Sequence, residues 1–266
     1  MQLGIMSGDG KLARFAALEN QLRVARSLSD SSSGLICFPL HDTCSQSCEE
    51  DRLFSQLCLT LIPEDRNDKN KRSTNNAPIA YKKVVVDNSA INLKRAVKRA
   101  SPGARFHCYW VYVHDDEVRG IAHCCCLLVD IVSRAAIIYE PYGSQNFPQS
   151  KLVQVALTNS ILAIYAAQNK QSRSNVMINS WGPQTPDHEY ELLCKKPGDP
   201  TGFCFAWCVH FIAYVKKRVA LEKPNTRSQV LRGYLCKYLG ITKDVINGGK
   251  CGSTNLIRPF ILAFDY

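Results

Sequence analysis

The sequence has no apolar run near the roughly 20 residues that a membrane-spanning helix needs. Its first residues, 1–9, lack the basic and apolar regions of a secretory signal peptide. Cysteine is plentiful, but the 13 residues are an odd number, and a chain of 266 residues is long for a disulfide-stapled scaffold. These features predict an intracellular protein from a reducing compartment, with no membrane partner and with most thiols packed as small apolar groups.

Metal-binding patterns are also missing. The sequence contains no H-E-x-x-H segment and no repeated C-x2-C knuckle. The nearest approach to a ligand set is Cys37, His41, Cys44, Cys48 and Cys58. The successive residues 124–126 are all cysteines, and in a strand they would point alternately to opposite faces, which suits core packing better than metal binding. We therefore predict no metal and no other cofactor.

Acidic residues are outnumbered by basic ones, 23 against 33, which gives a formal net charge of +10. There is no arginine-rich arm and no basic run with interleaved aromatics, so sequence-specific reading of DNA is not expected. A basic surface attracts nucleic acid, anionic membranes or acidic proteins without choosing among them. Solvated charged faces explain the composition most simply, and non-specific DNA binding remains an alternative.

The chain divides by composition near residue 78. Residues 11–28 have the spacing of an amphipathic helix, and the cysteine-rich residues 35–63 permit no assignment. Residues 64–78 are polar, as in a loop or linker. We therefore predict an N-terminal appendage at 1–78, of unknown role, and a main domain at 79–266.

The main domain is predicted to alternate strands and helices. Strands are expected at 80–86, 106–113, 123–132, 135–140 and 175–179, and helices at 91–100, 150–168, 203–221 and 227–239. This is an α+β plan, with a mostly antiparallel central sheet flanked by helices.

His123 opens one predicted strand and Glu140 closes the next, 17 positions later. The two-residue repeat of a strand places both on one face of the sheet. A hairpin centred at 131–132 would set them directly opposite, and one centred at 133–134 would set Glu140 opposite Leu127. Only the first register is expected to bring them into contact, so that the carboxylate could orient the imidazole. The alternative is a polar strand end and a surface charge.

Cys204 follows a turn, Asp199-Pro200-Thr201-Gly202, and begins a helix-like segment for which Thr201 is a plausible N-cap. A thiol in the first turn of a helix meets the positive end of the helix dipole, which lowers its pKa toward a reactive thiolate. Gly202 would leave room for a substrate backbone. The alternative is a packed cysteine, which is the interpretation we favour for Cys208, one turn later.

Gln184 is a candidate donor to an oxyanion, although it could equally be an ordinary loop glutamine. Other histidines could serve as the base instead of His123. They are His107, His114, His188 and His210, of which His188 is the principal rival because it lies in the polar loop before Cys204.

Taken together, these motifs resemble those of the adenain-like and SUMO-protease-like cysteine peptidase superfamily, most nearly a branch found in large DNA viruses. The motifs that carry the resemblance are His123 at a strand start, Ile138-Tyr139-Glu140-Pro141-Tyr142-Gly143, Gly182-Pro183-Gln184 and Gly202-Phe203-Cys204-Phe205-Ala206-Trp207. Their order is that of the family, and the resemblance covers about residues 105–220. Better-known members have tryptophan where this chain has Cys124, and often glycine where it has Phe205.

The resemblance implies a cysteine-peptidase fold for residues 79–266, with the nucleophile at a helix N-terminus. It implies Cys204 as nucleophile, His123 as base and then acid, and Glu140 as the orienting carboxylate. Gln184 would be the oxyanion donor, and Trp181, Gly202 and Trp207 would contact substrate, although a core position is the alternative for Trp207.

The implied reaction is cleavage of peptide or isopeptide bonds after glycine-containing motifs. The protein substrate would be a viral structural precursor or a ubiquitin-like conjugate, in the cytoplasm or nucleus of a host cell or within a virion. Two alternatives remain open. One is a Ser/Thr/Lys acetyltransferase that uses the same triad, and the other is a catalytically inactive, basic binding protein.

Overall fold

The structure is a computed structural model. It describes residues 27–29, 34–38, 57–63, 81–86, 104–115, 123–167, 175–184, 204–221, 230–247 and 256–257. Within these ranges, no helix combines the length and the apolar character needed to cross a bilayer.

A seven-stranded sheet runs through the centre of the described part of the chain. Its strands are β1 (Leu35–Phe38), β2 (Leu57–Pro63), β3 (Tyr81–Val86), β4 (Phe106–Asp115), β5 (His123–Asp130), β6 (Ala135–Tyr139) and β7 (Asn175–Ile178). They lie in the order β3-β2-β4-β5-β6-β7, and β1 pairs with β4 as well.

The sheet is mixed, so the prediction of a mostly antiparallel sheet was wrong. The pairs β2–β3, β4–β5 and β5–β6 are antiparallel. The pairs β1–β4, β2–β4 and β6–β7 are parallel. One physical reason is the connection from β6 to β7, which passes through a long helix, because a crossover of this kind returns the chain in the same direction.

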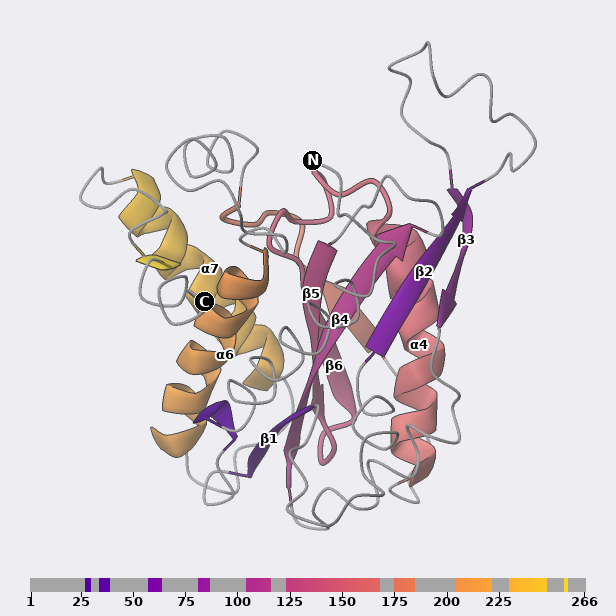
Figure 1. The fold of residues 1–266 in the computed structure, drawn as a ribbon. Coiled ribbons are helices and arrows are strands. Elements are labelled where there is room, and N and C mark those ends of the chain that lie inside the picture. Colours follow the sequence, from indigo (N-terminus) through magenta and orange to yellow (C-terminus); the bar gives the residue numbers. More distant parts are fainter. Residues whose placement is uncertain are drawn as a thin grey trace, which may run out of the picture.

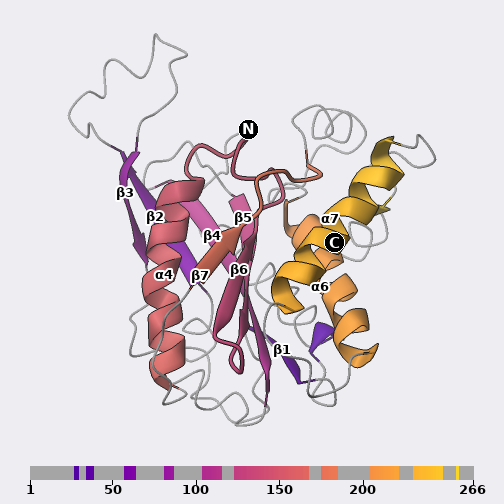
Figure 2. The ribbon, with the colours of Figure 1, turned by 180° about the vertical axis from the view of Figure 1, so that it is seen from behind.

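Helices cover both faces of the sheet. They are α4 (Ser150–Ala167), α6 (Cys204–Leu221) and α7 (Val230–Asn247). Figures 1 and 2 show α4 on one face and the pair α6 and α7 on the other. The helices predicted at 150–168 and 203–221 are confirmed, and α7 extends eight residues beyond the predicted end at 239. The helices predicted at 11–28 and 91–100 lie outside the described residues, apart from 27–28.

Two apolar cores lie between the sheet and these helices, and strand alternation assigns residues to one or the other. On β5, Cys124 and Cys126 pack toward α6 and α7, and Cys125 packs with the side chains on the α4 face. All three are buried free thiols, as predicted from the two-residue repeat.

The sheet includes strands from before residue 79. β1 pairs with the first half of β4, and β2 pairs with its second half. The division into an appendage (1–78) and a catalytic domain (79–266) stays a prediction, but residues 35–38 and 57–63 share one sheet with that domain.

Candidate active site

The hairpin of β5 and β6 sets the relative positions of His123 and Glu140. Its paired residues run from Cys126 opposite Tyr139 to the closing pair at 130 and 135. Continuing this register by one residue places Glu140 opposite Cys125. The observed register is therefore midway between the two considered from the sequence, which set Glu140 opposite His123 or Leu127. His123 and Glu140 are therefore diagonal neighbours. Neither of the two registers considered is the observed one, and the contact is made across a diagonal, which long side chains can span.

Asp130 holds the turn of this hairpin. Its carboxylate accepts hydrogen bonds from the backbone N–H groups of Val132 at 2.9 Å and Ser133 at 3.2 Å. Arg105 adds an ion pair at 2.9 Å, and Arg134 takes a left-handed backbone conformation with φ 57°. Burial alone would raise the pKa of Asp130, but hydrogen bonds from Arg105 and Ser133 and the charge of Arg105 lower it. The turn chemistry therefore fixes the register that brings the site together.

His123 and Glu140 form a buried ion pair. The imidazole Nε2 lies 2.8 Å from each of the two carboxylate oxygens. Only 5% of His123 and 1% of Glu140 is exposed. Burial alone would lower the pKa of His123, but the charge of Glu140 and hydrogen bonds with Cys204 and Glu140 raise it to about 10. The buried carboxylate therefore favours the protonated imidazolium.

The His123 ring is also held by packing. Its centroid lies 4.4 Å from that of Phe147 and 5.5 Å from that of Tyr142, both in the loop that follows Glu140. Glu140 is tied to the same loop, because its Oε1 accepts the backbone N–H of Tyr142 at 3.1 Å. One loop therefore orients both members of the ion pair.

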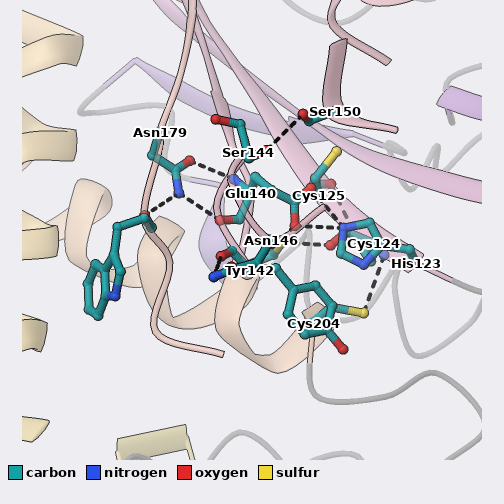
Figure 3. Close-up of polar contacts among 12 residues, drawn as sticks. His123, Cys124, Cys125, Glu140, Tyr142, Ser144, Asn146, Ser150, Asn179 and Cys204 are labelled. Atoms are coloured by element: carbon teal, nitrogen blue, oxygen red, sulfur yellow. Dashed lines mark hydrogen bonds and ion pairs between the residues drawn. The ribbon is translucent and has the colours of Figure 1, made fainter. Parts of the chain in front are cut away.

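Cys204 is the first residue of α6, as predicted, and lies beside His123. Its thiol is a hydrogen-bond partner of the His123 ring. The backbone N–H of Cys124 donates to its Sγ at 3.3 Å (Figure 3). A residue each from β5, the end of β6 and the start of α6 thus converges at one point.

The pKa of Cys204 differs from the expectation. Its position at the start of a helix predicted a lowered pKa, but burial raises it, because only 2% of the residue is exposed. The hydrogen bond and the positive charge of His123 act in the opposite direction. A thiolate at this position therefore depends on the imidazolium next to it.

The loops that follow β6 and β7 pack against each other next to Glu140. The two strands are parallel, so both loops leave the same end of the sheet. The backbone N–H groups of Ser144, Gln145 and Gln184 donate across the gap to carbonyls of Asn179, Ser180 and Pro141, at 2.9, 3.2 and 3.0 Å respectively.

Two glycines allow this approach. A Cβ on Gly143, which has φ 78°, would meet Ser180 and Trp181, and one on Gly182 would meet the backbone of Pro141. The glycines of the Glu140-Pro141-Tyr142-Gly143 and Gly182-Pro183-Gln184 motifs therefore have a packing role.

Asn179 is a site residue that sequence reasoning missed. It follows β7, it is buried, and its amide hydrogen-bonds to the backbone of Glu140 (Figure 3). The available signal was a single Asn after a short apolar strand, a pattern that an ordinary turn also produces.

The remaining predicted residues have mixed outcomes. Gln184 is buried and its backbone is anchored to Pro141, and its oxyanion role stays a prediction. Trp181 is half-buried, with the Lys243 ammonium 5.9 Å from its ring centroid. Trp207 is 1% exposed and packs in the core, which favours the alternative stated for it. Gly202 lies outside the described residues.

The rival histidines that can be placed have other partners. Nδ1 of His107 lies 3.3 Å from the Tyr109 hydroxyl, and Nδ1 of His210 lies 2.9 Å from the Tyr238 hydroxyl. Burial and the nearby Lys217 lower the pKa of His210 to about 4, so it is neutral at physiological pH. His188 and the side chain of His114 lie outside the described part of the chain. Among the histidines whose side chains the structure describes, His123 is the one that contacts Cys204.

The cysteine-rich ligand set considered for zinc cannot be assembled from the described residues. Cys37 lies buried in β1, and His41, Cys44, Cys48 and the side chain of Cys58 fall outside them. Cys208 packs in the core as predicted, with its thiol donating to the Cys124 carbonyl at 3.7 Å.

Comparison with known proteins gives similarity at the level of solved structures. No family model and no curated protein matches the chain. A crystal structure of the Legionella pneumophila effector protein RavZ is 10% identical, with a TM-score of 0.38 over 87% of this chain and 52% of that one. RavZ in complex with human LC3B is 12% identical, with a TM-score of 0.35 over 76% of this chain and 45% of that one.

The Chlamydia abortus effector protein ChlaDUB is also similar. It is 12% identical, with a TM-score of 0.30 over 61% of this chain and 65% of that one. The chain spans about half the length of the RavZ structures that it matches. The resemblance to the branch in large DNA viruses stays a prediction.

Proposed function

We propose that this protein is a thiol peptidase that cleaves peptide or isopeptide bonds by acyl transfer. One observation carries the proposal, namely the contact of Cys204 with His123 and of His123 with Glu140 in a buried cluster. These residues supply a nucleophile, a base and a carboxylate that orients the base, which are the groups that covalent hydrolysis requires.

The charges around Cys204 favour reaction through a thiolate. Glu140 stabilises the imidazolium form of His123, so the positive charge that a thiolate at Cys204 needs is held next to the sulfur. The partial positive charges of the Cys124 backbone N–H and of the N-terminal end of α6 both face the Cys204 sulfur. The thiolate and the imidazolium therefore stabilise each other in this buried setting.

In the first half-reaction the Cys204 sulfur attacks the carbonyl carbon of the scissile bond, and the carbonyl oxygen becomes an oxyanion. The C–N bond then breaks, the imidazolium of His123 gives its proton to the leaving amine, and a thioester remains on Cys204. In the second half-reaction neutral His123 takes a proton from water, and the resulting hydroxide attacks the thioester. The C–S bond then breaks and the acid product leaves, which restores the Cys204 thiolate beside the His123 imidazolium.

The oxyanion would be stabilised by the Gln184 side chain and a backbone N–H near the start of α6. The support for Gln184 is its attachment to the site. Its backbone N–H donates to the carbonyl of Pro141, the residue after the proposed carboxylate.

We propose ubiquitin-like conjugates or viral structural precursors as substrates, cleaved after glycine-containing segments, within a host cell or virion. The small exposed fractions of Cys204 and His123, 2% and 5%, support a slender substrate segment, because side chains beyond Cα would need additional room. Trp181, which is half-buried in the loop that carries Gln184, is the candidate wall for that segment. Non-specific DNA binding through the basic surface is a separate property that the site does not require.

The test is labelling with a glycine-ended electrophilic probe, with peptide mapping to quantify each modified cysteine. Cys236, an exposed thiol on α7, gives a reference labelling rate in the same molecule. We expect Cys204 to react faster than Cys236, and His123→Ala to slow it by about 100-fold or more. His210→Ala, which removes a histidine bonded to Tyr238, should leave the rate within a few fold.

Matched thiol variants complete the test. Cys204→Ala should abolish cleavage of a glycine-ended amide reporter, whereas Cys208→Ala, one turn along the same helix, should retain it. Labelling of Cys204 no faster than of Cys236 would overturn the proposal and favour the inactive binding protein. Transfer from acetyl-CoA to a peptide, without amide cleavage, would instead identify the acetyltransferase alternative.

A further inference from the structure

The Asn179 side chain forms two hydrogen bonds to the backbone of Glu140, the residue that carries the proposed catalytic carboxylate. Its Oδ1 accepts the backbone N–H of Glu140 at 2.7 Å, and its Nδ2 donates to the backbone carbonyl of Glu140, also at 2.7 Å. Asn179 is 4% exposed and Glu140 is 1% exposed. Both backbone polar groups of Glu140 are therefore bonded to a single buried amide.

This arrangement extends the sheet by one residue. The pairing of β6 with β7 ends at Ile138 opposite Ile178. Beyond that point the Asn179 amide offers one donor and one acceptor, which are the groups that a further strand residue would present. Glu140 is thus fixed as if it were still within the ladder, although it lies past the end of β6.

The same amide connects the two loops of the site. Nδ2 of Asn179 makes a second hydrogen bond, to the carbonyl of Trp181, at 2.7 Å. Three residues on, Gln184 donates its backbone N–H to Pro141, next to Glu140. The loop that carries Gln184 and the backbone of Glu140 therefore belong to one hydrogen-bonded unit with Asn179 at its centre, as Figure 3 shows for the Asn179 and Glu140 contacts.

We propose that Asn179 is a positioning residue, which holds the Glu140 backbone so that the carboxylate is aimed at His123. The inference deepens the proposed function and depends on it for the catalytic consequence. Asn179 acts through Glu140, and its contacts are to backbone groups rather than to the sulfur or the imidazole.

The consequence is electrostatic. Among the described residues, the titratable groups that act on His123 are Glu140 and Cys204, and the Tyr142 and Phe147 rings pack against it. The contacts between Nε2 and the carboxylate oxygens are 2.8 Å, and attraction between buried charges weakens as such a distance grows. A Glu140 released from Asn179 would therefore stabilise the imidazolium less.

The test measures His123 directly, without requiring activity. The chain has six histidines, so the imidazole Cε1–H signals can be followed by NMR against pH and assigned with His123→Gln. In the wild type, His123 should titrate near pH 10. In Asn179→Ala it should titrate at least about one pH unit lower, toward the value found in Glu140→Gln. Cleavage of the amide reporter should fall about 10-fold or more in kcat, with KM little changed.

The matched control is Asn146→Ala. Asn146 is an exposed residue of the same region, and its Nδ2 donates to the Tyr142 carbonyl at 3.1 Å. This variant also removes an Asn-to-backbone hydrogen bond, two residues after Glu140, but it leaves the bonds between Asn179 and Glu140 intact, so the His123 titration and kcat should change much less than in Asn179→Ala. Asn179→Ser, which keeps a hydroxyl acceptor in a smaller side chain, should give an intermediate titration and provides the measurement if Asn179→Ala does not fold.

The two proposals fail in different ways. A folded Asn179→Ala or Asn179→Ser protein in which His123 titrates as in the wild type would overturn the positioning role, whatever the activity. A wild type in which His123 titrates near pH 10 but Cys204 neither labels rapidly nor cleaves the reporter would instead overturn the proposed function.

Discussion

At the scale of single residues, the site depends on three side chains whose properties come from burial. His123 carries a positive charge in a place where burial would otherwise remove it, because Glu140 lies 2.8 Å away. Cys204 is less acidic than its place at a helix start suggests, because it is almost completely buried. The chemistry therefore depends on the three residues as a unit, and a change in one alters the protonation of the others.

Glu140→Gln should move the alkaline limb of the pH profile for kcat/KM. In the wild type this limb reflects loss of the His123 proton, near pH 10. The amide cannot stabilise the imidazolium by charge, so the limb should fall toward the ordinary histidine value of about 6.5. Hydrolysis of the amide reporter from pH 6 to 11 measures it, and an unmoved limb would mean that another group controls the proton.

At the scale of secondary-structure elements, the β5–β6 hairpin determines whether the site exists. A one-residue change in register would move His123 and Glu140 to opposite faces of the sheet. The turn avoids this through the Asp130 carboxylate, which bonds two backbone N–H groups, and through its ion pair with Arg105. A structural carboxylate outside the reacting groups therefore sets their geometry.

Asp130→Asn should lower the free energy of unfolding at pH 7 by about 1–3 kcal/mol, because charge-assisted hydrogen bonds are lost. The pKa of Asp130 is lowered in the folded state, so its contribution is present above the unfolded pKa of about 3.9 and is lost as pH falls through the lower folded pKa. Urea unfolding at pH 7 and at acid pH checks this, since the difference between the two proteins should shrink as pH falls. Asp244→Asn, at an exposed position on α7, should show no such difference.

At the scale of the whole molecule, the site lies where both helical layers and the N-terminal strands support one sheet. α6 supplies Cys204 from one face, and Phe147, on the α4 side, packs against His123. β4, the neighbour of β5, is covered along its other edge by β1 and β2. Residues before 79 thus stabilise the strand beside His123, although they supply none of the proposed catalytic groups.

Removal of residues 1–78 should therefore prevent cooperative folding. Leu35, Leu57, Leu59 and Leu61 would be lost from the cores, and all four are fully buried. Each contributes about 1.5–3 kcal/mol, and together they approach the roughly 5–15 kcal/mol by which a domain is stable. Thermal unfolding of residues 79–266, followed by circular dichroism, should show no sharp transition. A sharp transition with rapid Cys204 labelling would support the predicted division of the chain.

The local elements of the site could be predicted from the sequence, because each depends on neighbouring residues. A turn followed by an apolar run predicted Cys204 at a helix start, and a strand-like run predicted His123 at a strand start. The two-residue repeat predicted Cys124 to Cys126 on alternating faces. The order of the motifs suggested a thiol peptidase. These inferences concern short range, where the spacing of side chains follows from backbone geometry.

Tertiary structure decided what the sequence left open, because long-range pairing depends on interactions that no local pattern encodes. It set a hairpin register between the two considered, added parallel strands on either side of β4 to β6, and raised the pKa of Cys204 through burial. It also placed Asn179, 39 positions from Glu140, where its amide completes the sheet. The types of chemical group were therefore determined by the sequence, and their contacts and protonation by the packing of distant segments.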